Sequence, residues 1–295
     1  MTHAELIVDA RNGVGESPVW SVSEQALYWV DIPAKKLQRW DARTAAVQAW
    51  TASEMLACIA PHGAGGFIAG METGLFHIRT TAGDALECML LQATPHAATG
   101  MRFNDGRCDR QGRFLAGSMV MDMGKCHNAG VIVSYAKNSV FKTIRQKLIT
   151  PNGMAFSPDG HTLYTSDSHP SVQTVWASDY DTATGMPSNQ RVFVDMGSLP
   201  GRPDGAAVDS DGCYWICGND AGLIHRFTPQ GKLDQSLAVP VKKPAMCAFG
   251  GNDLRTLFVT SIRPDGVDLA DQPLAGGVFA LQPGVQGLPE LIFLA

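Results

Sequence analysis

Four polar residues, Glu16, Asn104, Asn152 and Asp204, occupy the same position in a repeated sequence pattern. In "PNGMAFSPDGHTLY", Asn152 precedes a short apolar run and lies eight residues before Gly160, which ends a turn ahead of a second strand. The other three polar residues have the same spacing to the start of a second strand. If they meet, two carboxylates and two amide oxygens form a ligand set that suits calcium, magnesium or manganese better than a thiolate-bound zinc. We interpret them as a site for one divalent metal ion.

Asn-Gly and Asp-Gly pairs also have a purely conformational use, because both tolerate positive φ in loops. That explanation suffices for a single pair, whereas four polar residues in one register favour a shared site. Asp105 competes with Asn104 for the third-unit position, because its "DG" matches the "DG" of Asp204. The spacing to the downstream turn favours Asn104.

The pattern occurs six times, beginning near residues 16, 58, 104, 152, 204 and 245. Spacings of 41 to 52 residues match the length of a four-stranded propeller blade. Each unit has a short apolar strand, a turn, and a second strand rich in aromatic and β-branched residues. The sequence therefore predicts an all-β protein, a six-bladed β-propeller forming a single domain over residues 1–295. A two-domain all-β protein is the alternative.

Both ends of the chain, "AELIVDA" and "ELIFLA", are predicted to be strands. If they share one blade, they close the ring and remove its exposed sheet edge. The first strand of each propeller blade lies beside the central channel. The six repeated positions should then surround one mouth of the channel, with the weakly polar or apolar Cys58 and Ala245 completing the ring.

The composition excludes several classes of partner. The chain is 45% hydrophobic and 17% charged with a net charge of −5, and it has no basic stripe for nucleic acid. No apolar run is long enough to span a bilayer, and the first residues lack the order of a signal peptide. Seven irregularly spaced cysteines indicate reduced thiols. We expect a cytoplasmic protein, a monomer or weak homo-oligomer, that binds no nucleic acid and no membrane.

The chain resembles the family of gluconolactonase, regucalcin (senescence marker protein) and luciferin-regenerating enzyme. Four motifs carry the resemblance in order: "GESPVW", "RFNDGRCDRQGRFLAGSM", "PNGMAFSPDG" and "RPDGAAVD". It implies a six-bladed propeller that hydrolyses a sugar lactone with a divalent metal (calcium, zinc, magnesium or manganese). It implies metal ligands at Glu16, Asn152 and Asp204, with Asp204 also acting as proton donor or acceptor. It implies substrate contacts from Arg102 and Asn104.

The chain departs from the family after "AGSM". Some members have a sugar-binding glutamate there, whereas Asp122 occupies that place by ungapped counting. Asp122 is one methylene shorter, so it is a candidate substrate contact that bears on the sugar preference. Arg202 precedes Asp204 by two residues, as Arg102 precedes Asn104, and either substrate binding or a salt bridge between blades would explain it.

A lactone is an internal ester, so its hydrolysis requires an activated water and a stabilised oxyanion. A bound metal can polarise the carbonyl or lower the pKa of water, and Asp204 can carry the proton. Asp204 as a ligand alone is the alternative for that residue. For the whole protein, the alternatives are a non-catalytic calcium-binding or scaffold propeller, or an aryl-esterase or phosphotriesterase activity. The chain has no Gly-x-Ser-x-Gly motif, which disfavours a serine hydrolase.

Overall fold

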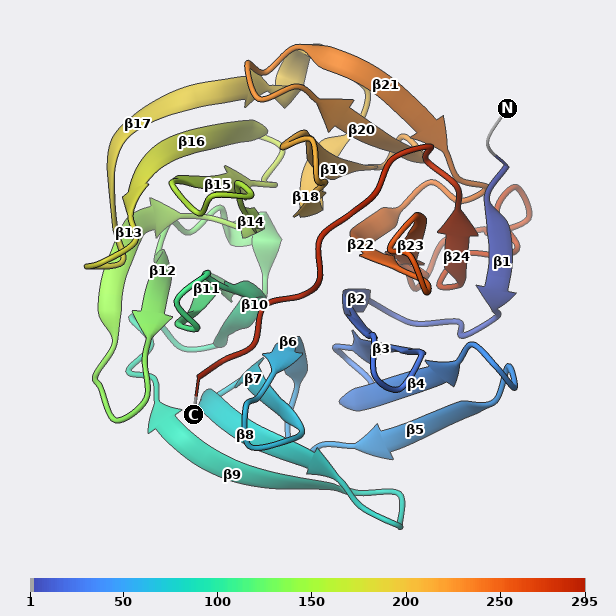
Figure 1. Ribbon diagram of the computed structural model, residues 1–295, viewed down its shortest axis with the longest axis horizontal. Helices are drawn as coiled ribbons and strands as arrows, with labels where there is room; N and C mark the ends of the chain where they lie inside the picture. Colours follow the sequence, from blue (N-terminus) through green and yellow to red (C-terminus); the bar gives the residue numbers. More distant parts are fainter. Residues whose placement is uncertain (1–2, 295) are drawn as a thin grey trace.

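Six antiparallel sheets of four strands each are arranged around a central channel in the computed structural model, which describes residues 3–294. Figure 1 looks along the channel and shows the sheets as blades. The predicted six-bladed propeller is confirmed. Two short 3-10 helices, η1 (Met123–Lys125) and η2 (Met196–Ser198), are the helical elements of the described residues.

Each blade is built in chain order from the channel outward, except at the closure. The innermost strands are β2 (Gly15–Ser21), β6 (Leu56–Pro61), β10 (Met101–Cys108), β14 (Pro151–Phe156), β18 (Arg202–Val208) and β22 (Pro244–Gly250). The second strands are β3 (Ala26–Asp31), β7 (Phe67–Met71), β11 (Phe114–Val120), β15 (Thr162–Asp167), β19 (Tyr214–Asn219) and β23 (Thr256–Ser261). The innermost strands contain all six predicted repeat positions.

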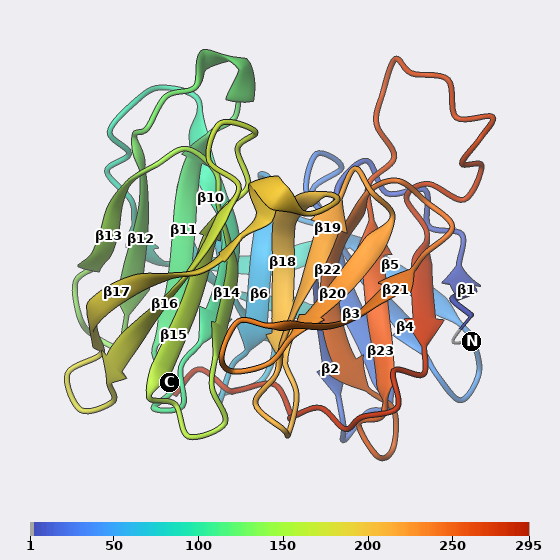
Figure 2. The same cartoon turned by 90° about the horizontal axis from the view of Figure 1, so that it is seen from above.

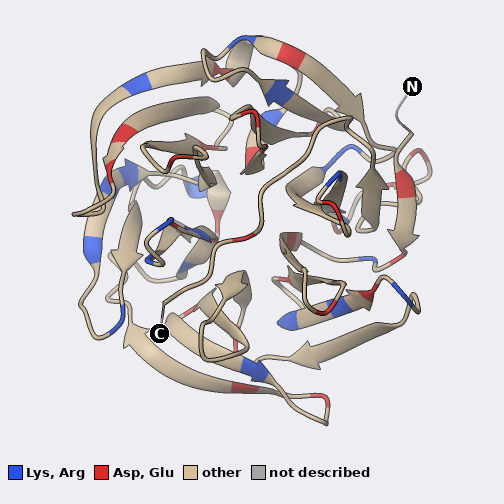
Figure 3. Ribbon diagram, in the orientation of Figure 1, with Lys and Arg blue, Asp and Glu red and all other residues tan. Residues whose placement is uncertain are grey.

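The two outer layers complete the blades. The third strands are β4 (Lys36–Asp41), β8 (Gly74–Thr80), β12 (Gly130–Tyr135), β16 (Thr174–Asp181), β20 (Leu223–Phe227) and β24 (Val278–Leu281). The outermost strands are β5 (Val47–Thr51), β9 (Leu86–Ala93), β13 (Lys142–Leu148), β17 (Met186–Asp195), β21 (Leu233–Ala238) and β1 (Glu5–Val8). Charged residues of both signs are distributed around the ring, as Figure 3 shows.

The ring closes through the N-terminal strand. β1 pairs antiparallel with β24, so the N-terminal strand completes the last blade and covers the outer edge of β24. The prediction for "ELIFLA" was wrong, because the described part of this segment is not a strand of any sheet. It crosses the channel mouth as an extended segment (Figure 1), and Phe293 exchanges backbone hydrogen bonds with Pro61 and Gly63.

Every innermost strand has an irregular register at the repeat position. The pairing with the second strand shifts between Glu16 and Val19 and between Asn152 and Ala155, and the other four innermost strands shift at equivalent points. Such bulges change the direction of a side chain at the end of a strand. In β14 the bulge includes Gly153 at φ +63°, and a Cβ there would lie 2.6 Å from the Ser166 Oγ. The glycine after Asn152 is therefore required by conformation and by space.

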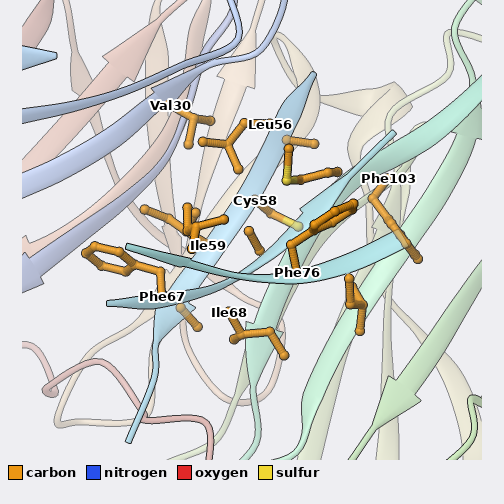
Figure 4. Packing of buried hydrophobic residues seen from close by; sticks show 14 of the residues in the cluster. Val30, Leu56, Cys58, Ile59, Phe67, Ile68, Phe76 and Phe103 are labelled. Carbon is orange, nitrogen blue, oxygen red and sulfur yellow. The ribbon is translucent and has the colours of Figure 1, made fainter. Parts of the chain in front are cut away.

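Apolar side chains fill the spaces between neighbouring blades. Figure 4 shows Val30 of the first blade, Leu56 and Cys58 of the second, and Phe103 of the third in one cluster. All four are nearly or fully buried. This packing stabilises the blades against one another and holds the innermost strands in fixed positions around the channel. Cys58 belongs to this core, and burial raises the pKa of its thiol.

The two mouths of the channel differ. Figure 2 shows the segments 121–129 and 262–277 rising above one end of the ring, while the C-terminal segment crosses the other end.

The seven cysteines are free thiols. Within residues 3–294, no helix has the length and apolar character needed to cross a membrane.

Candidate active site

A cavity of about 280 Å³ lies at the open mouth, between the raised segments. Its lining includes five residues predicted from the sequence: Glu16, Arg102, Asn104, Asn152 and Asp204. They come from β2, β10, β14 and β18; the last three are consecutive in the ring, and β2 lies across the channel from β14. The bulges place these side chains at the ends of the innermost strands, where they converge.

A chain of hydrogen bonds orients the two amides. Arg102 Nη1 donates to Asn104 Oδ1 at 2.8 Å, and Asn104 Nδ2 donates to Asn152 Oδ1 at 3.2 Å. Asn152 Nδ2 donates to Ser168 Oγ at 2.7 Å. Each amide is thereby held by a neighbour in a defined orientation. Asn152 is buried, and its amide oxygen lies on the side shared with Asn104.

Asp204 is held from the second strand of its own blade. Asn219, the last residue of β19, donates through Nδ2 to Asp204 Oδ2 at 2.6 Å. The Oδ1 of Asn219 accepts from Arg202 at 3.3 Å and from Lys243 at 3.5 Å. Asn219 therefore connects the carboxylate to two cationic side chains of the cavity wall.

The two carboxylates are destabilised as anions. Burial, and then the charges of Asp204 and Asp105, raise the pKa of Glu16 well above its usual range. Burial raises the pKa of Asp204 to about 7, against the opposing effects of Arg202 and Asn219. Neither forms an ion pair with any residue that the structure describes. Two buried carboxylates in one cavity without a cation are unfavourable, which fits a site that a divalent cation would neutralise.

The donor set matches a hard cation. It comprises the carboxylates of Glu16 and Asp204 with the amide oxygen of Asn152. Among residues 3–294, no three His, Cys, Asp or Glu side chains form a group that could hold a metal ion, so the proposed donor set depends on the amide oxygen of Asn152 as well as on the two carboxylates. Oxygen donors of this kind suit calcium, magnesium and manganese.

Two other sequence candidates lie outside the cavity lining. Asp105 is buried, and its Oδ2 accepts a hydrogen bond from the Met154 amide at 2.8 Å, which ties β10 to β14. Asp122 lies at the start of η1 with its side chain 60% exposed, 3.5 Å from Lys125 Nζ. The lining near it is formed by Met119 and Met123. The structure thus brings Asn104 to the site and leaves Asp105 and Asp122 outside it.

Arg202 makes contacts within and between blades. Its Nε lies 2.6 Å from Asp220 Oδ2 in the same blade, and its Nη1 donates to the carbonyl of Ser168 in the preceding blade at 3.1 Å. Of the two alternatives for Arg202, the salt bridge between blades is not observed, because its ion pair with Asp220 lies inside the fifth blade. Arg202 nevertheless lines the cavity.

Sequence reasoning missed Ser168, Asn219 and Lys243, all of which line the cavity. The first two end or follow the second strands β15 and β19, and Lys243 immediately precedes β22. One signal was available: "SDS" and "CGND" put polar residues at corresponding ends of two apolar second strands. These ends lie beside the repeat positions because the paired strands are antiparallel.

The fold and the site together define a class of protein, and comparison with known proteins agrees. Residues 14–263 match the family described as "SMP-30/Gluconolactonase/LRE-like region". The chain belongs to this family. It is a hydrolase of the gluconolactonase-like class, which acts on carboxylic ester bonds.

Individual relatives cover almost the whole chain. A 6-deoxy-6-sulfogluconolactonase of Pseudomonas putida is 39% identical over 291 residues, 98% of each chain. Regucalcin of Danio rerio is 33% identical over 290 residues, 97% of this chain and 96% of that one. A crystal structure of the calcium-binding protein regucalcin from Agrobacterium tumefaciens has a TM-score of 0.91 at 26% identity, with 98% and 97% of the chains covered.

Proposed function

We propose that the protein hydrolyses the internal ester of a sugar lactone to the open-chain aldonic acid, with a divalent cation held by Glu16, Asn152 and Asp204. One observation carries the proposal. Two buried carboxylates face one cavity beside an oriented amide, and neither has a cationic partner within ion-pair distance among residues 3–294. The names of the relatives, a sulfogluconolactonase and a calcium-binding regucalcin, support the substrate class and the metal.

The substrate is oriented by Arg102 and Asn104. Arg102 uses Nη1 for Asn104 Oδ1 and for the carbonyl of Phe103, and the residue lines the cavity. Such a fork suits hydroxyl and carbonyl oxygens of a sugar ring. Asp122 is 60% exposed and does not line the cavity. The primary substrate contacts in this proposal are therefore Arg102 and Asn104.

Asp204 moves the proton. Its carboxylate accepts a proton from the water that attacks the lactone carbonyl carbon, and returns it to the ring oxygen as the carbon–oxygen bond breaks. A divalent cation bound by the three ligands would polarise the carbonyl oxygen. Asn219 positions Asp204 through the 2.6 Å hydrogen bond, which leaves the Oδ1 of Asp204 for the reaction. If Asp204 is a ligand alone, its amide variant keeps most of its turnover.

Metal removal tests the proposal. The protein is dialysed against chelator, its metal content is measured, and glucono-1,5-lactone hydrolysis is followed before and after addition of calcium, magnesium, manganese or zinc. We expect activity to disappear and to return with at least one metal. Full activity in a verified metal-free sample contradicts the metal site. Failure to hydrolyse any aldonolactone with any of the four metals contradicts the lactonase activity itself.

A further inference from the structure

A cysteine and a histidine from neighbouring blades meet at the rim of the open mouth, outside the cavity lining. Cys126 is exposed on the raised segment 121–129 (Figure 2), and its Sγ lies 3.3 Å from Nε2 of His169. His169 lies two residues beyond the end of β15 in the fourth blade, and its side chain is buried. The mechanism proposed above uses neither side chain.

The surroundings of His169 determine which of its ring nitrogens carries the proton. The Ser171 amide donates to Nδ1 at 3.2 Å, and Ser171 Oγ lies 2.7 Å from the same atom. A nitrogen that accepts an amide hydrogen bond carries no hydrogen, so neutral His169 has its proton on Nε2. This N–H faces the sulfur of Cys126, whose own thiol donates to the Gly124 carbonyl at 3.8 Å. The sulfur is therefore the acceptor in the pair.

The histidine ring is held in place before any reagent arrives. The His169 backbone amide donates to Asp167 Oδ1 at 3.0 Å, and its carbonyl accepts from the Val172 amide at 2.8 Å. An N–H group that points at a sulfur stabilises the thiolate that forms when the thiol reacts. A nucleophile beside a ring that a third residue orients, here Ser171, is the arrangement found at activated nucleophiles.

Cys126 is the exposed member of the seven cysteines. Cys88 is half-buried, and the remaining five are buried. Burial raises the pKa of the thiol in Cys58, Cys88, Cys108, Cys213 and Cys217. Because the thiolate is the reacting form, a reagent that enters from solvent is directed to Cys126.

We propose that Cys126 is a modification site that forms a mixed disulfide with a low-molecular-weight disulfide, with His169 stabilising the attacking thiolate, and that the adduct narrows the entrance of the cavity. In this exchange the Cys126 thiol gives its proton to solvent, and its sulfur attacks one sulfur of the reagent. The new S–S bond forms as the old one breaks, and the departing thiolate takes up a proton from solvent. Cys126 is oxidised and half of the reagent is reduced to a thiol, so no other oxidant is needed.

The adduct would lie beside two residues of the cavity lining. The Cys126 amide donates to the Met123 carbonyl at 3.1 Å, and Met123 lines the cavity. His169 directly follows Ser168, another lining residue, whose Oγ accepts a hydrogen bond from Asn152. A group attached to Cys126 is therefore placed at the rim between them. The effect on substrate entry rests on the proposed function, whereas the thiol reaction does not.

The first test uses the wild-type protein, with oxidised glutathione as the probe and peptide mapping by mass spectrometry as the readout. The reference is an unstructured peptide with the sequence of residues 121–129 in the same buffer. We expect one adduct, on Cys126, which dithiothreitol removes. Its rate of formation should exceed that of the peptide by about tenfold, the scale of one hydrogen bond to a charged group. A rate equal to or below that of the peptide, or an adduct on another cysteine, overturns the proposal.

Two variants of His169 separate hydrogen-bond donation from bulk. His169→Leu removes the N–H and should lower the rate at Cys126 to that of the peptide. His169→Gln keeps an amide N–H that can reach the sulfur, so it should retain a larger part of the rate. His127→Gln is the matched control, because His127 is the exposed neighbour of Cys126 in the sequence. An equal loss in His127→Gln and His169→Leu would overturn the role of His169.

The last measurement concerns the entrance of the cavity. The purified mixed disulfide should hydrolyse glucono-1,5-lactone with KM raised about fivefold or more and kcat changed less, the pattern of an impaired binding step. Dithiothreitol should restore KM, and Cys126→Ser should keep wild-type kinetics in the presence of the reagent. Equal kinetics of the modified and unmodified proteins would overturn the effect on the entrance. If neither form hydrolyses any aldonolactone with any of the four metals, the proposed function fails and the effect on entry fails with it, while the mass measurement still decides the thiol reaction.

Discussion

Asn219 Nδ2 donates to Asp204 Oδ2 at 2.6 Å. This contact joins the end of β19 to the repeat position in β18, the innermost strand of the same blade. It lowers the pKa of Asp204 against a larger effect of burial. The same amide accepts hydrogen bonds from Arg202 and Lys243 through its oxygen. Asn219 therefore holds the side chain of Asp204 and accepts hydrogen bonds from two cationic residues that line the cavity.

The Asn219→Asp variant tests this relationship. It removes the donor and adds a negative charge beside Asp204, so the pKa of Asp204 should rise further. Protons then compete with the metal up to a higher pH, and the acidic limb of activity at subsaturating metal should move upward by about one pH unit. Asn189→Asp is the control, because Asn189 donates to Asp179 on the exposed surface at 2.9 Å. An unchanged pH profile for Asn219→Asp would show that Asn219 does not position Asp204.

Asp204→Asn separates proton transfer from metal binding. The amide keeps the size and one oxygen ligand but has no basic site. Loss of a positioned acid–base group typically lowers the rate by about 10²–10⁴-fold, so we expect kcat at saturating metal to fall about a hundredfold or more. The thermal melt in metal should be largely retained. A metal-saturated variant with near wild-type kcat would make Asp204 a ligand alone, and another base would be needed.

The metal-free protein should become less stable as the pH rises. The pKa of Asp204 is about 7 in the fold, above the ordinary value of about 4, so between these pH values the folded state binds more protons than the unfolded chain. Its contribution to the free energy of unfolding is therefore present at pH 4 and is lost as the pH passes 7. Glu16 is shifted in the same direction and adds to this loss.

The measurement is the Tm of wild type and Asp204→Asn in chelator at pH 5.5 and pH 8. Relative to wild type, the variant should be more stable at pH 8 than at pH 5.5, because it lacks the carboxyl that ionises between them. Saturating metal should reverse the order at pH 8, since the cation binds the carboxylate. A parallel pH dependence of the two proteins in chelator would refute the assignment.

Gly153→Ala tests the bulge that directs Asn152. Gly153 has φ +63°, and a Cβ there would lie 2.6 Å from both Ser166 Oγ and Tyr214 OH. Gly65→Ala is the control, with φ +85° and no atom within 4 Å of the added Cβ. The left-handed conformation costs about 1–2 kcal/mol at either site, and overpacking adds about 1–3 kcal/mol at Gly153 alone. Urea unfolding should show this difference, and equal losses would contradict it.

Much of the site could be predicted from the sequence because the propeller repeats itself. Each innermost strand begins at the same distance from its turn, so the spacing that relates Asn152 to Gly160 also identifies Glu16 and Asp204. A closed ring then places equivalent positions at one mouth, whatever their separation along the chain. For these residues, the position in the sequence repeat predicts the position in the structure.

The tertiary structure alone decided the surroundings of these residues. Asn219 contacts Asp204 from the end of β19, and Lys243 contacts Asp220 from the loop before β22, which has no counterpart in the repeat pattern. Asp122 has the expected place in the sequence, but the chain beyond β11 leaves the sheet and carries it to the surface. Register along a strand is local, whereas the path of a loop depends on everything packed around it.

The C-terminal segment is another part of the structure that could not be predicted from the sequence. The apolar "ELIFLA" has the composition of a strand, yet a strand needs a partner edge, and β1 already pairs with β24. Phe293 instead packs against His62 and Tyr135 at the closed mouth of the channel. The sequence by itself determined the six blades and the acidic and amide residues at their inner ends. Which strand edges remained for pairing, and which side chains surround the site, were decided only when all six blades had closed into the ring, because only then is each edge and each neighbour defined.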